Sequence, residues 1–398
     1  MGSHGIKDKV AIVGMHCTNF GEAWESSAED LAIEAVRGAA KSTGVEVDDV
    51  DAFWLGSSIT MDVGICLAAP LQLQNKPVSV VRNFCATGSE ALRQAAYAVS
   101  SGAYDLALAV GVEKTKDGGW SGLPRDFPPN DGTVRNLSAA AMYSMILPAY
   151  AEKYGIEVDE LRRTLARIGS KNHANGAKNP LAQFRREVSV DSICAAPSIA
   201  GQLGVFDCAG VADGAAAAVV CRAEDAHRYT DKPIFIKALS LVAGTGSGLI
   251  DPEYDYTTFP EVVASATDAY AQADIEDPRA ELAMAEVHDC FTPTELVLME
   301  DLRFAERGEG WREVEAGTFD LDGELPVNSD GGLKAFGHPV GASGLRMHYE
   351  CFLQLRGEVD PERAIPASDR TKALVHNLGG YPGEMVSFVS VVGSEPDS

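Results

Sequence analysis

The sequence reads NFCATGSE at residues 83–90, between an apolar run at 78–81 and a helical stretch at 90–99. This pattern predicts a short strand, a tight turn and a helix, with Cys85 at the helix start. Unpaired backbone N–H groups and the positive end of the helix dipole meet there. We therefore expect a lowered pKa for the Cys85 thiol, which makes this residue a candidate nucleophile. The alternative is a small buried side chain in a turn.

Three later segments carry further reactive side chains. They are HDCF at residues 288–291, GHPVGA at 337–342 and NLGG at 377–380. Together with the Cys85 turn, they resemble the four active-site loops of the thiolase superfamily, in the order and spacing of that family and along nearly the whole chain. The HDCF segment resembles the sterol-carrier-protein type of thiolase. The chain stops at residue 398, so we expect no lipid-carrier domain after this core.

Composition sets limits on the kind of protein. The chain has 398 residues, 45% hydrophobic and 23% charged, with no apolar run long enough to cross a bilayer. Its net charge of −25 argues against nucleic acid or an anionic membrane as a partner. Eight cysteines are scattered without a CxxC pair. This spacing predicts no metal site and favours a reducing cytoplasm.

The same succession of elements occurs twice along the chain. We expect strands at 10–13, 52–56, 78–81 and 106–110 and helices at 27–42 and 90–99 in the first half, which ends with an apolar strand at 213–220. The second half has strands at 233–241, 373–375 and 383–392, a strand ending at 288, and helices at 262–273 and 345–355. Ser27 and Asp30, or Ser26 and Glu29, can form a capping box for the first helix. Corresponding loops of two duplicated halves meet at one interface.

A segment between the two halves breaks the repeat. It covers about 114–198, begins with a Gly- and Pro-rich stretch at 117–132 and is rich in basic side chains. Basic groups on an acidic protein suit a polyphosphate ligand such as the nucleotide end of coenzyme A. The alternative is a solvated helix face. The candidate coenzyme A-binding residues are Arg162, Arg163, Arg167, Lys171, Lys178, Arg185 and Arg186.

The resemblance implies a fold and a division into domains. It implies an α/β thiolase fold, with two duplicated β-α-β-α-β-α-β-β halves that form a five-layer α-β-α-β-α core with an inserted loop domain. We expect an N-terminal half at 6–113 and 199–230, a loop domain that covers coenzyme A at 114–198, and a C-terminal half at 231–394.

The resemblance also implies roles for five residues. Cys85 carries the acyl group, and His338 takes its thiol proton. Most thiolases have a second cysteine near the C-terminus, where this chain has Asn377, so Cys290 of HDCF becomes the general acid/base. His288 supplies one oxyanion donor. The backbone N–H groups of Cys85 and Gly379 supply a second oxyanion hole.

The predicted function is a coenzyme A-dependent C-acyltransferase of lipid metabolism, which makes or cleaves 3-oxoacyl-CoA by Claisen or retro-Claisen chemistry. Coenzyme A thioesters are its substrates, with no permanently bound cofactor, and the resemblance implies a homodimer or tetramer. One alternative is an acyltransferase or aldol lyase that acts on another acceptor with a small OB-fold (zinc-ribbon) acyl-CoA-binding partner. Another is a non-catalytic scaffold in such a complex. Candidates for lining the acyl pocket are Met61, Trp120 and Tyr143.

Overall fold

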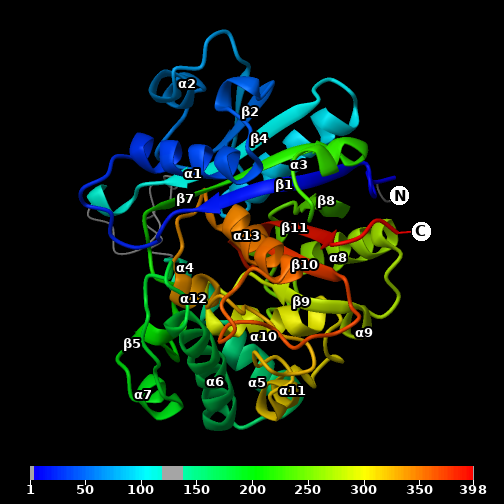
Figure 1. The fold of residues 1–398 in the computed structure, drawn as a ribbon. Coiled ribbons are helices and arrows are strands. Elements are labelled where there is room, and N and C mark those ends of the chain that lie inside the picture. Colours follow the sequence, from blue (N-terminus) through cyan, green and yellow to red (C-terminus); the bar gives the residue numbers. More distant parts are fainter. Residues whose placement is uncertain (1–3, 119–137, 398) are drawn as a thin grey trace.

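The computed structural model describes residues 4–118 and 138–397 (Figure 1). Trp120 and most of the Gly- and Pro-rich stretch lie outside these ranges. The first half of the core consists of β1 (Val10–Cys17), α1 (Ala28–Thr43), β2 (Ala52–Gly56), α2 (Ile65–Leu71), β3 (Val78–Val81), α3 (Thr87–Ser100), β4 (Leu106–Glu113) and β7 (Gly214–Arg222).

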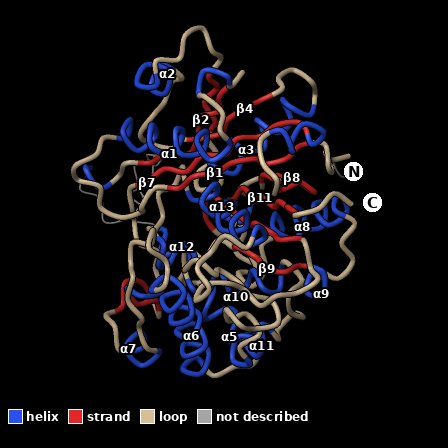
Figure 2. The backbone as a smooth tube through the Cα atoms, in the orientation of Figure 1, coloured by secondary structure: helices blue, strands red, loops and turns tan. Residues whose placement is uncertain are grey.

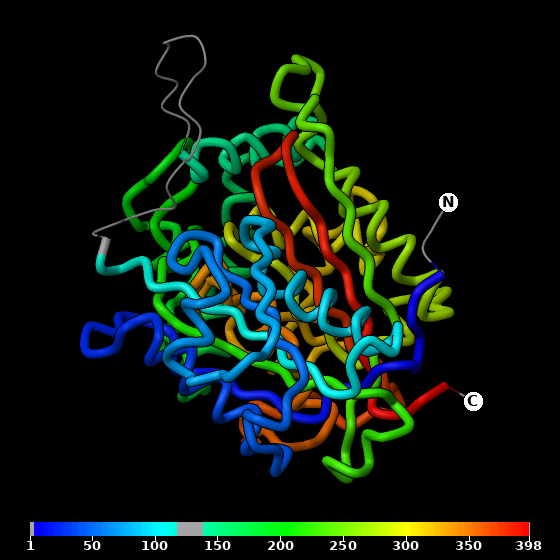
Figure 3. Tube along the Cα trace, turned by 90° about the horizontal axis from the view of Figure 1, so that it is seen from above, coloured from blue at the N-terminus to red at the C-terminus, as the bar shows by residue number. Residues whose placement is uncertain are grey.

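The second half repeats this order with a long excursion between its second strand and the helix α13. Its elements are β8 (Ile234–Ala243), α8 (Pro260–Ala273), α9 (Pro278–Glu281), β9 (Leu282–Glu286), α10 (Thr292–Asp301), α11 (Gly310–Ala316), α12 (Gly332–Phe336), α13 (Ser343–Arg356), β10 (Lys372–Tyr381) and β11 (Glu384–Gly393). Both described ends of the chain lie on the same side of the molecule (Figure 3).

The strands of the two halves join into one nine-stranded sheet (Figure 2). Its order is β3-β2-β4-β7-β1-β8-β11-β10-β9, and β1 and β8 meet in the middle through the pairs Ala11 with Phe235 and Ile12 with Ile234. Equivalent strands therefore follow one another in mirror order on the two sides of this junction. The duplication read from the sequence is thus a structural one.

The two halves of the sheet form two of the five expected layers. The other three are helical: α1 and α2 outside the first half, α3 and α13 between the halves, and α8 and α10 outside the second half. One apolar core packs α1 and α2 against the outer face of the first half, and a second surrounds α3 and α13 between the two halves. A third core joins α8 and α10 to the second half and to the helices of the inserted segment. Because α3 and α13 share the middle layer, their N-terminal ends and the loops before them come together.

The inserted segment forms a helical layer at the foot of the view in Figure 1. Its described elements are α4 (Ala139–Tyr143), α5 (Ile146–Tyr154), α6 (Val158–Ala177), α7 (Val190–Cys194), β5 (Ser198–Ala200) and β6 (Leu203–Gly204). The side chains of Leu161, Leu165 and Ile168 on α6 join the third apolar core, so this layer packs firmly on the second half. We call it the lid.

Local sequence signals account for several element ends. Ser27 caps α1, since its hydroxyl accepts from the Asp30 N–H at 3.1 Å and the Asp30 carboxylate accepts from the Ser27 N–H at 2.9 Å. β10 runs further than expected, so Asn377 and Gly379 lie within a strand. No described helix combines the length and the apolar character that a membrane span requires.

Candidate active site

Cys85 lies in the turn between β3 and α3, where Phe84 adopts a left-handed backbone with φ of +47°. The Thr87 hydroxyl holds this turn, donating to the Phe84 carbonyl at 2.6 Å and accepting from the Asn83 N–H at 2.8 Å. Gly379 of β10 packs against the same turn. A Cβ at position 379 would lie 2.6 Å from the Asn83 carbonyl oxygen and 2.9 Å from the Cys85 nitrogen, so glycine is required there.

His338 lies in the loop between α12 and α13. Gly337 before it has φ of +110°, and the His338 N–H donates to the Gly210 carbonyl at 2.8 Å. The ring nitrogen Nδ1 lies 2.7 Å from the Ser343 hydroxyl, which donates its hydrogen to the Pro339 carbonyl at 3.0 Å. Ser343 must therefore accept from Nδ1–H. This places the lone pair of the imidazole on Nε2, which is buried and has no hydrogen-bond partner among the described residues.

His288 follows β9 and has the opposite tautomer. The Asn377 carboxamide accepts from the Ser89 hydroxyl at 3.0 Å and donates through Nδ2 to Nδ1 of His288 at 2.9 Å. Because Nδ1 accepts, the proton of this imidazole is on Nε2. The rings of His288 and His338 meet edge to face, with centroids 5.3 Å apart. His338 thus offers the site an acceptor, and His288 offers it a donor.

The three side chains Cys85, His288 and His338 converge on one buried point. One ligand atom of each lies within 4.8 Å of the others. A zinc ion takes four donors of these types, and no fourth His, Cys, Asp or Glu of the described residues joins the set. The arrangement therefore fits a nucleophile with an acceptor and a donor better than it fits a metal centre.

Cys290 is buried close by, at the end of the HDCF segment and just before α10. Its sulfur lies 3.8 Å from the Thr294 hydroxyl oxygen. Burial raises the pKa of the Cys290 thiol well above its ordinary value, and the nearby Cys85 raises it further. The two thiols from opposite halves of the chain are therefore close enough for the charge of one to affect the other.

The thiol pKa of Cys85 is raised, which corrects the sequence-based expectation. Burial lifts it to about 12, and the charge of Glu113 adds to the rise. Desolvation disfavours the thiolate more than the helix start favours it. Burial also lowers the pKa of His338 to about 3, assisted by the charge of Arg346. In the resting site Cys85 is a protonated thiol beside a neutral imidazole, and its proton must move during the reaction.

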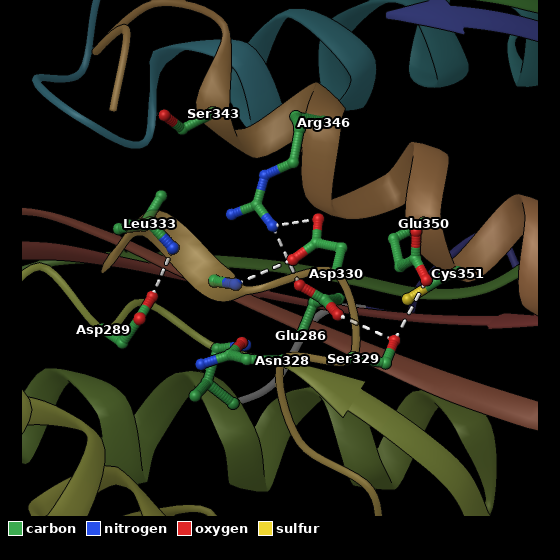
Figure 4. A network of polar contacts seen from close by, with 12 residues as sticks. Glu286, Asp289, Asn328, Ser329, Asp330, Leu333, Ser343, Arg346, Glu350 and Cys351 are labelled. Atoms are coloured by element: carbon green, nitrogen blue, oxygen red, sulfur yellow. Dashed lines mark hydrogen bonds and ion pairs between the residues drawn. The ribbon is translucent and has the colours of Figure 1, made fainter. Parts of the chain in front are cut away.

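Arg346 is the centre of a buried ion network (Figure 4), and its charge adds to burial in lowering the pKa of both His288 and His338. Its guanidinium on α13 pairs with Glu286 at 3.0 Å and with Asp330. Ser329 connects this cluster to Glu350, which lies 3.1 Å from the Ser329 hydroxyl. The network joins the ends of β9 and α13 and so fixes the distance between the loops that carry His288 and His338.

Two residues of α6, in the region expected to bind coenzyme A, form contacts that hold the HDCF loop instead. Asn172 of α6 donates through Nδ2 to Asp289 at 2.8 Å and to Glu295 at 2.7 Å. The buried Lys171 ammonium pairs with Glu295 at 2.7 Å and donates to the Val327 carbonyl at 2.8 Å. The expected ligand contact of Lys171 is therefore not supported by its position, because its donors face the protein interior.

The other basic side chains are dispersed. Arg162 pairs with Asp207 at 2.8 Å and Arg167 with Asp320 at 2.9 Å, while the exposed Arg163 pairs with Asp191 at 3.1 Å. Lys178 is exposed. Arg162 and Arg163 line a cavity of about 360 Å³. Arg185 and Arg186 are exposed on the rim of a larger cavity, about 820 Å³, which also contains His173.

Several residues of this site carried no signal of their own in the sequence. Ser89 and Ser343 are serines in the first turns of α3 and α13, where serine is common, and Asn172 is one polar residue within a long helix. Glu113 is fully buried and accepts from the Thr60 N–H at 2.8 Å and the Gly341 N–H at 3.1 Å. The partners of Ser89, Asn172 and Glu113 lie between 53 and 288 residues away in the sequence. The partner of Ser343 is His338, five residues before it. Only the tertiary structure identifies them.

Comparison with known proteins identifies the protein family. Residues 10–224 match the family described as thiolase, N-terminal domain, and residues 245–391 match the thiolase C-terminal domain-like family. The chain belongs to the thiolase family of acyltransferase enzymes.

Among its relatives is an acetyl-CoA acetyltransferase of Methanothermobacter thermautotrophicus, 35% identical over 387 residues, which span 94% of this chain and 97% of the relative. Sterol carrier protein 2 of Homo sapiens is 29% identical over 93% of this chain and 70% of its own length. Among solved structures, an Ltp2-ChsH2(DUF35) aldolase has a similar fold, with a TM-score of 0.83, 24% identity and coverage of 99% of this chain and 100% of the other.

Proposed function

We propose that the protein is a coenzyme A-dependent C-acyltransferase that makes or cleaves 3-oxoacyl-CoA through acyl-Cys85. The observation that carries the proposal is the buried cluster of Cys85, His338 and His288, in which one imidazole has a lone pair on Nε2 and the other a proton. A nucleophile, a base and an oxyanion donor are the groups that acyl transfer from a thioester requires.

In the first half-reaction the Cys85 sulfur attacks the thioester carbonyl and its proton passes to Nε2 of His338. The bond between the acyl carbon and the sulfur of coenzyme A breaks. Cys290 protonates the departing thiolate and is left as a thiolate itself. The backbone N–H groups of Cys85 and Gly379 stabilise the oxyanion, and removing such a donor commonly costs about 3 kcal/mol of transition-state stabilisation.

In the second half-reaction the Cys290 thiolate takes an α-proton from a second thioester. Nε2–H of His288 donates to the enolate oxygen. The new carbanion attacks the acyl group on Cys85, a carbon–carbon bond forms, and the released Cys85 thiolate recovers its proton from His338. Protons and charges return to their starting positions, and the reverse sequence cleaves a 3-oxoacyl thioester.

For coenzyme A itself, we propose that the lid supplies the binding surface. Arg185 and Arg186 are the strongest of the basic candidates, because neither forms an ion pair with another described residue and both line the larger cavity. Arg162 and Arg163 line the smaller one. Arg167 and Lys178 stay weaker candidates. The family relative crystallised in complex with CoA, a human mitochondrial 3-ketoacyl-CoA thiolase, supports a coenzyme A site in this fold.

The test is incubation with acetyl-CoA followed by mass spectrometry of the Cys85 peptide. The wild type should carry one acetyl group there, and Cys85→Ala should carry none. Cys290→Ala should still be acetylated, though slowly, but should lose exchange of the α-protons of acetyl-CoA with deuterium from D₂O. Cys194→Ala, a half-buried thiol of the lid, is the matched control. Absence of the adduct in the wild type would favour the scaffold function, and equal loss in both active-site variants would refute the division of roles.

A second candidate is acyl transfer or aldol cleavage on another acceptor, in complex with an OB-fold partner. The structural neighbour described above, an Ltp2-ChsH2(DUF35) aldolase, supports it. The presence of a cysteine at position 85 favours acyl transfer. Release of acetyl-CoA from acetoacetyl-CoA that depends on free coenzyme A distinguishes a thiolase, since aldol cleavage uses no thiol.

We also propose a homodimer or tetramer, in a reducing cytoplasm. β3 pairs with β2 alone and forms an edge of the sheet among the described strands. Ile59, Val63 and Ile65 are exposed near this edge. An apolar surface beside an open strand edge is suited to association. All eight cysteines are free, as a reducing compartment requires. Light scattering coupled to gel filtration measures the oligomeric state.

A further inference from the structure

Tyr143, at the end of α4, connects the lid to two of the active-site loops. Its ring stacks on Phe291 with centroids 4.7 Å apart and planes inclined by 24°. Its hydroxyl donates to the Gly380 carbonyl at 3.1 Å. The side chain is 2% exposed. Phe291 directly follows Cys290 and Gly380 directly follows Gly379, so one buried phenol contacts the neighbours of the proposed acid/base and of an oxyanion donor.

The Tyr143 hydroxyl is also near Cys290, because it lowers the pKa of the Cys290 thiol, as a donor to the thiolate does. A phenol has one hydrogen, and in the resting site that hydrogen is directed to the Gly380 carbonyl. The Tyr143 oxygen is then left as an acceptor for the Cys290 S–H group. The other polar contact of this sulfur, the Thr294 hydroxyl, is long at 3.8 Å.

The direction of hydrogen bonding between Tyr143 and Cys290 must reverse once Cys290 has given its proton away. A buried thiolate is unfavourable unless hydroxyl groups donate to it, and Thr294 and Tyr143 are the two hydroxyls that lower the pKa of Cys290. Rotation about the C–O bond of Tyr143 turns its hydrogen from the Gly380 carbonyl to the sulfur, with no movement of the backbone. Burial keeps the pKa of Tyr143 well above its ordinary value, so the phenol retains this hydrogen throughout.

We propose that Tyr143 is a positioning residue whose hydroxyl accepts from the Cys290 thiol at rest and donates to the Cys290 thiolate between the two half-reactions. The proposal rests on the proposed function, in which Cys290 alternates between acid and base. It assigns to the lid a direct part in the proton transfer, in addition to any contact with coenzyme A.

The variant that tests this is Tyr143→Phe, which removes the hydroxyl and keeps the ring that stacks on Phe291. We expect deuterium exchange at the α-carbon of acetyl-CoA to slow about 10- to 100-fold, as for loss of a hydrogen bond to a charged group. Acetylation of Cys85 in a single turnover should slow by a smaller factor than exchange, because the attacking thiol gives its proton to His338 and Cys290 acts only on the leaving group. The matched control is Tyr150→Phe, since Tyr150 is a buried phenol of the neighbouring helix α5 that donates to Glu300.

A second measurement needs no enzymatic activity. In a Cys85→Ala background, the pH dependence of Cys290 alkylation by iodoacetamide should move upward by about one to two pH units on removal of the Tyr143 hydroxyl. A purely structural role of Tyr143 would leave this profile in place. The proposal is overturned if the profile is unchanged, or if Tyr143→Phe slows acetylation and exchange equally. A wild type that shows neither acetylation nor exchange refutes the proposed function, while the alkylation profile still decides on the hydrogen bond.

Discussion

The reaction of Cys85 with iodoacetamide should be slow at pH 7 and should rise about tenfold for each pH unit up to pH 9. The rate depends on pH in this range because burial raises the pKa of the Cys85 thiol from an ordinary 9.0 to about 12. The thiolate fraction at pH 7 is then about 10⁻⁵, compared with about 10⁻² for an ordinary thiol. The thiolate is the reactive form, and its fraction rises with pH because the thiol loses its proton.

The expected magnitude follows from two opposing effects. The smaller thiolate fraction lowers the rate by about 1000-fold, and the greater basicity of the thiolate raises its intrinsic nucleophilicity by about 20-fold. The net expectation is that Cys85 reacts about 50-fold more slowly in the folded enzyme than in the unfolded chain at pH 7. Quantifying the alkylated Cys85 peptide by mass spectrometry, with and without urea, measures this ratio directly.

The His338→Ala variant sharpens the assay. His338 has a pKa of about 3 and is neutral in the resting site, with no proton on Nε2, so its removal should leave the pH slope of Cys85 alkylation unchanged. A rate in the wild type that is constant from pH 7 to pH 8, and that becomes pH-dependent in His338→Ala, would show a resting thiolate–imidazolium pair. That result would refute the argument that desolvation outweighs the helix start.

Two further outcomes are expected. Ser343→Ala should slow acetylation of Cys85 about five- to tenfold, because the Nδ1–H tautomer of His338 loses its acceptor. Single-turnover acetylation measures this change, and an unchanged rate would contradict the tautomer assignment. Arg346→Met should lower the free energy of unfolding by about 3 to 5 kcal/mol, because it leaves two buried carboxylates without their cation. Urea unfolding followed by circular dichroism measures that change, and a loss below about 1 kcal/mol would contradict a structural role for the network.

Local patterns in the sequence were sufficient for most of the fold. The capping box of Ser27 and Asp30, the strand at 52–56 and the helix start after Cys85 depend on residues a few positions apart. The duplication was also visible, because both halves repeat one succession of periodicities. The extension of β10 through Asn377 and Gly379 was missed, since Gly-Gly is typical of a turn and only the pairing with β11 keeps it extended.

Sequence by itself also indicated the residues that we propose for the chemistry, since a thiol in a strand-to-helix turn and an imidazole held between Gly337 and Pro339 are unusual local arrangements. The tertiary structure alone decided their protonation states and their partners. The tautomers of His288 and His338 depend on Asn377 and Ser343, and Lys171 faces a carboxylate of α10 rather than a ligand. The physical reason is that backbone conformation is set by neighbouring residues along the chain, whereas desolvation and hydrogen-bond partners depend on which distant segments enclose a side chain.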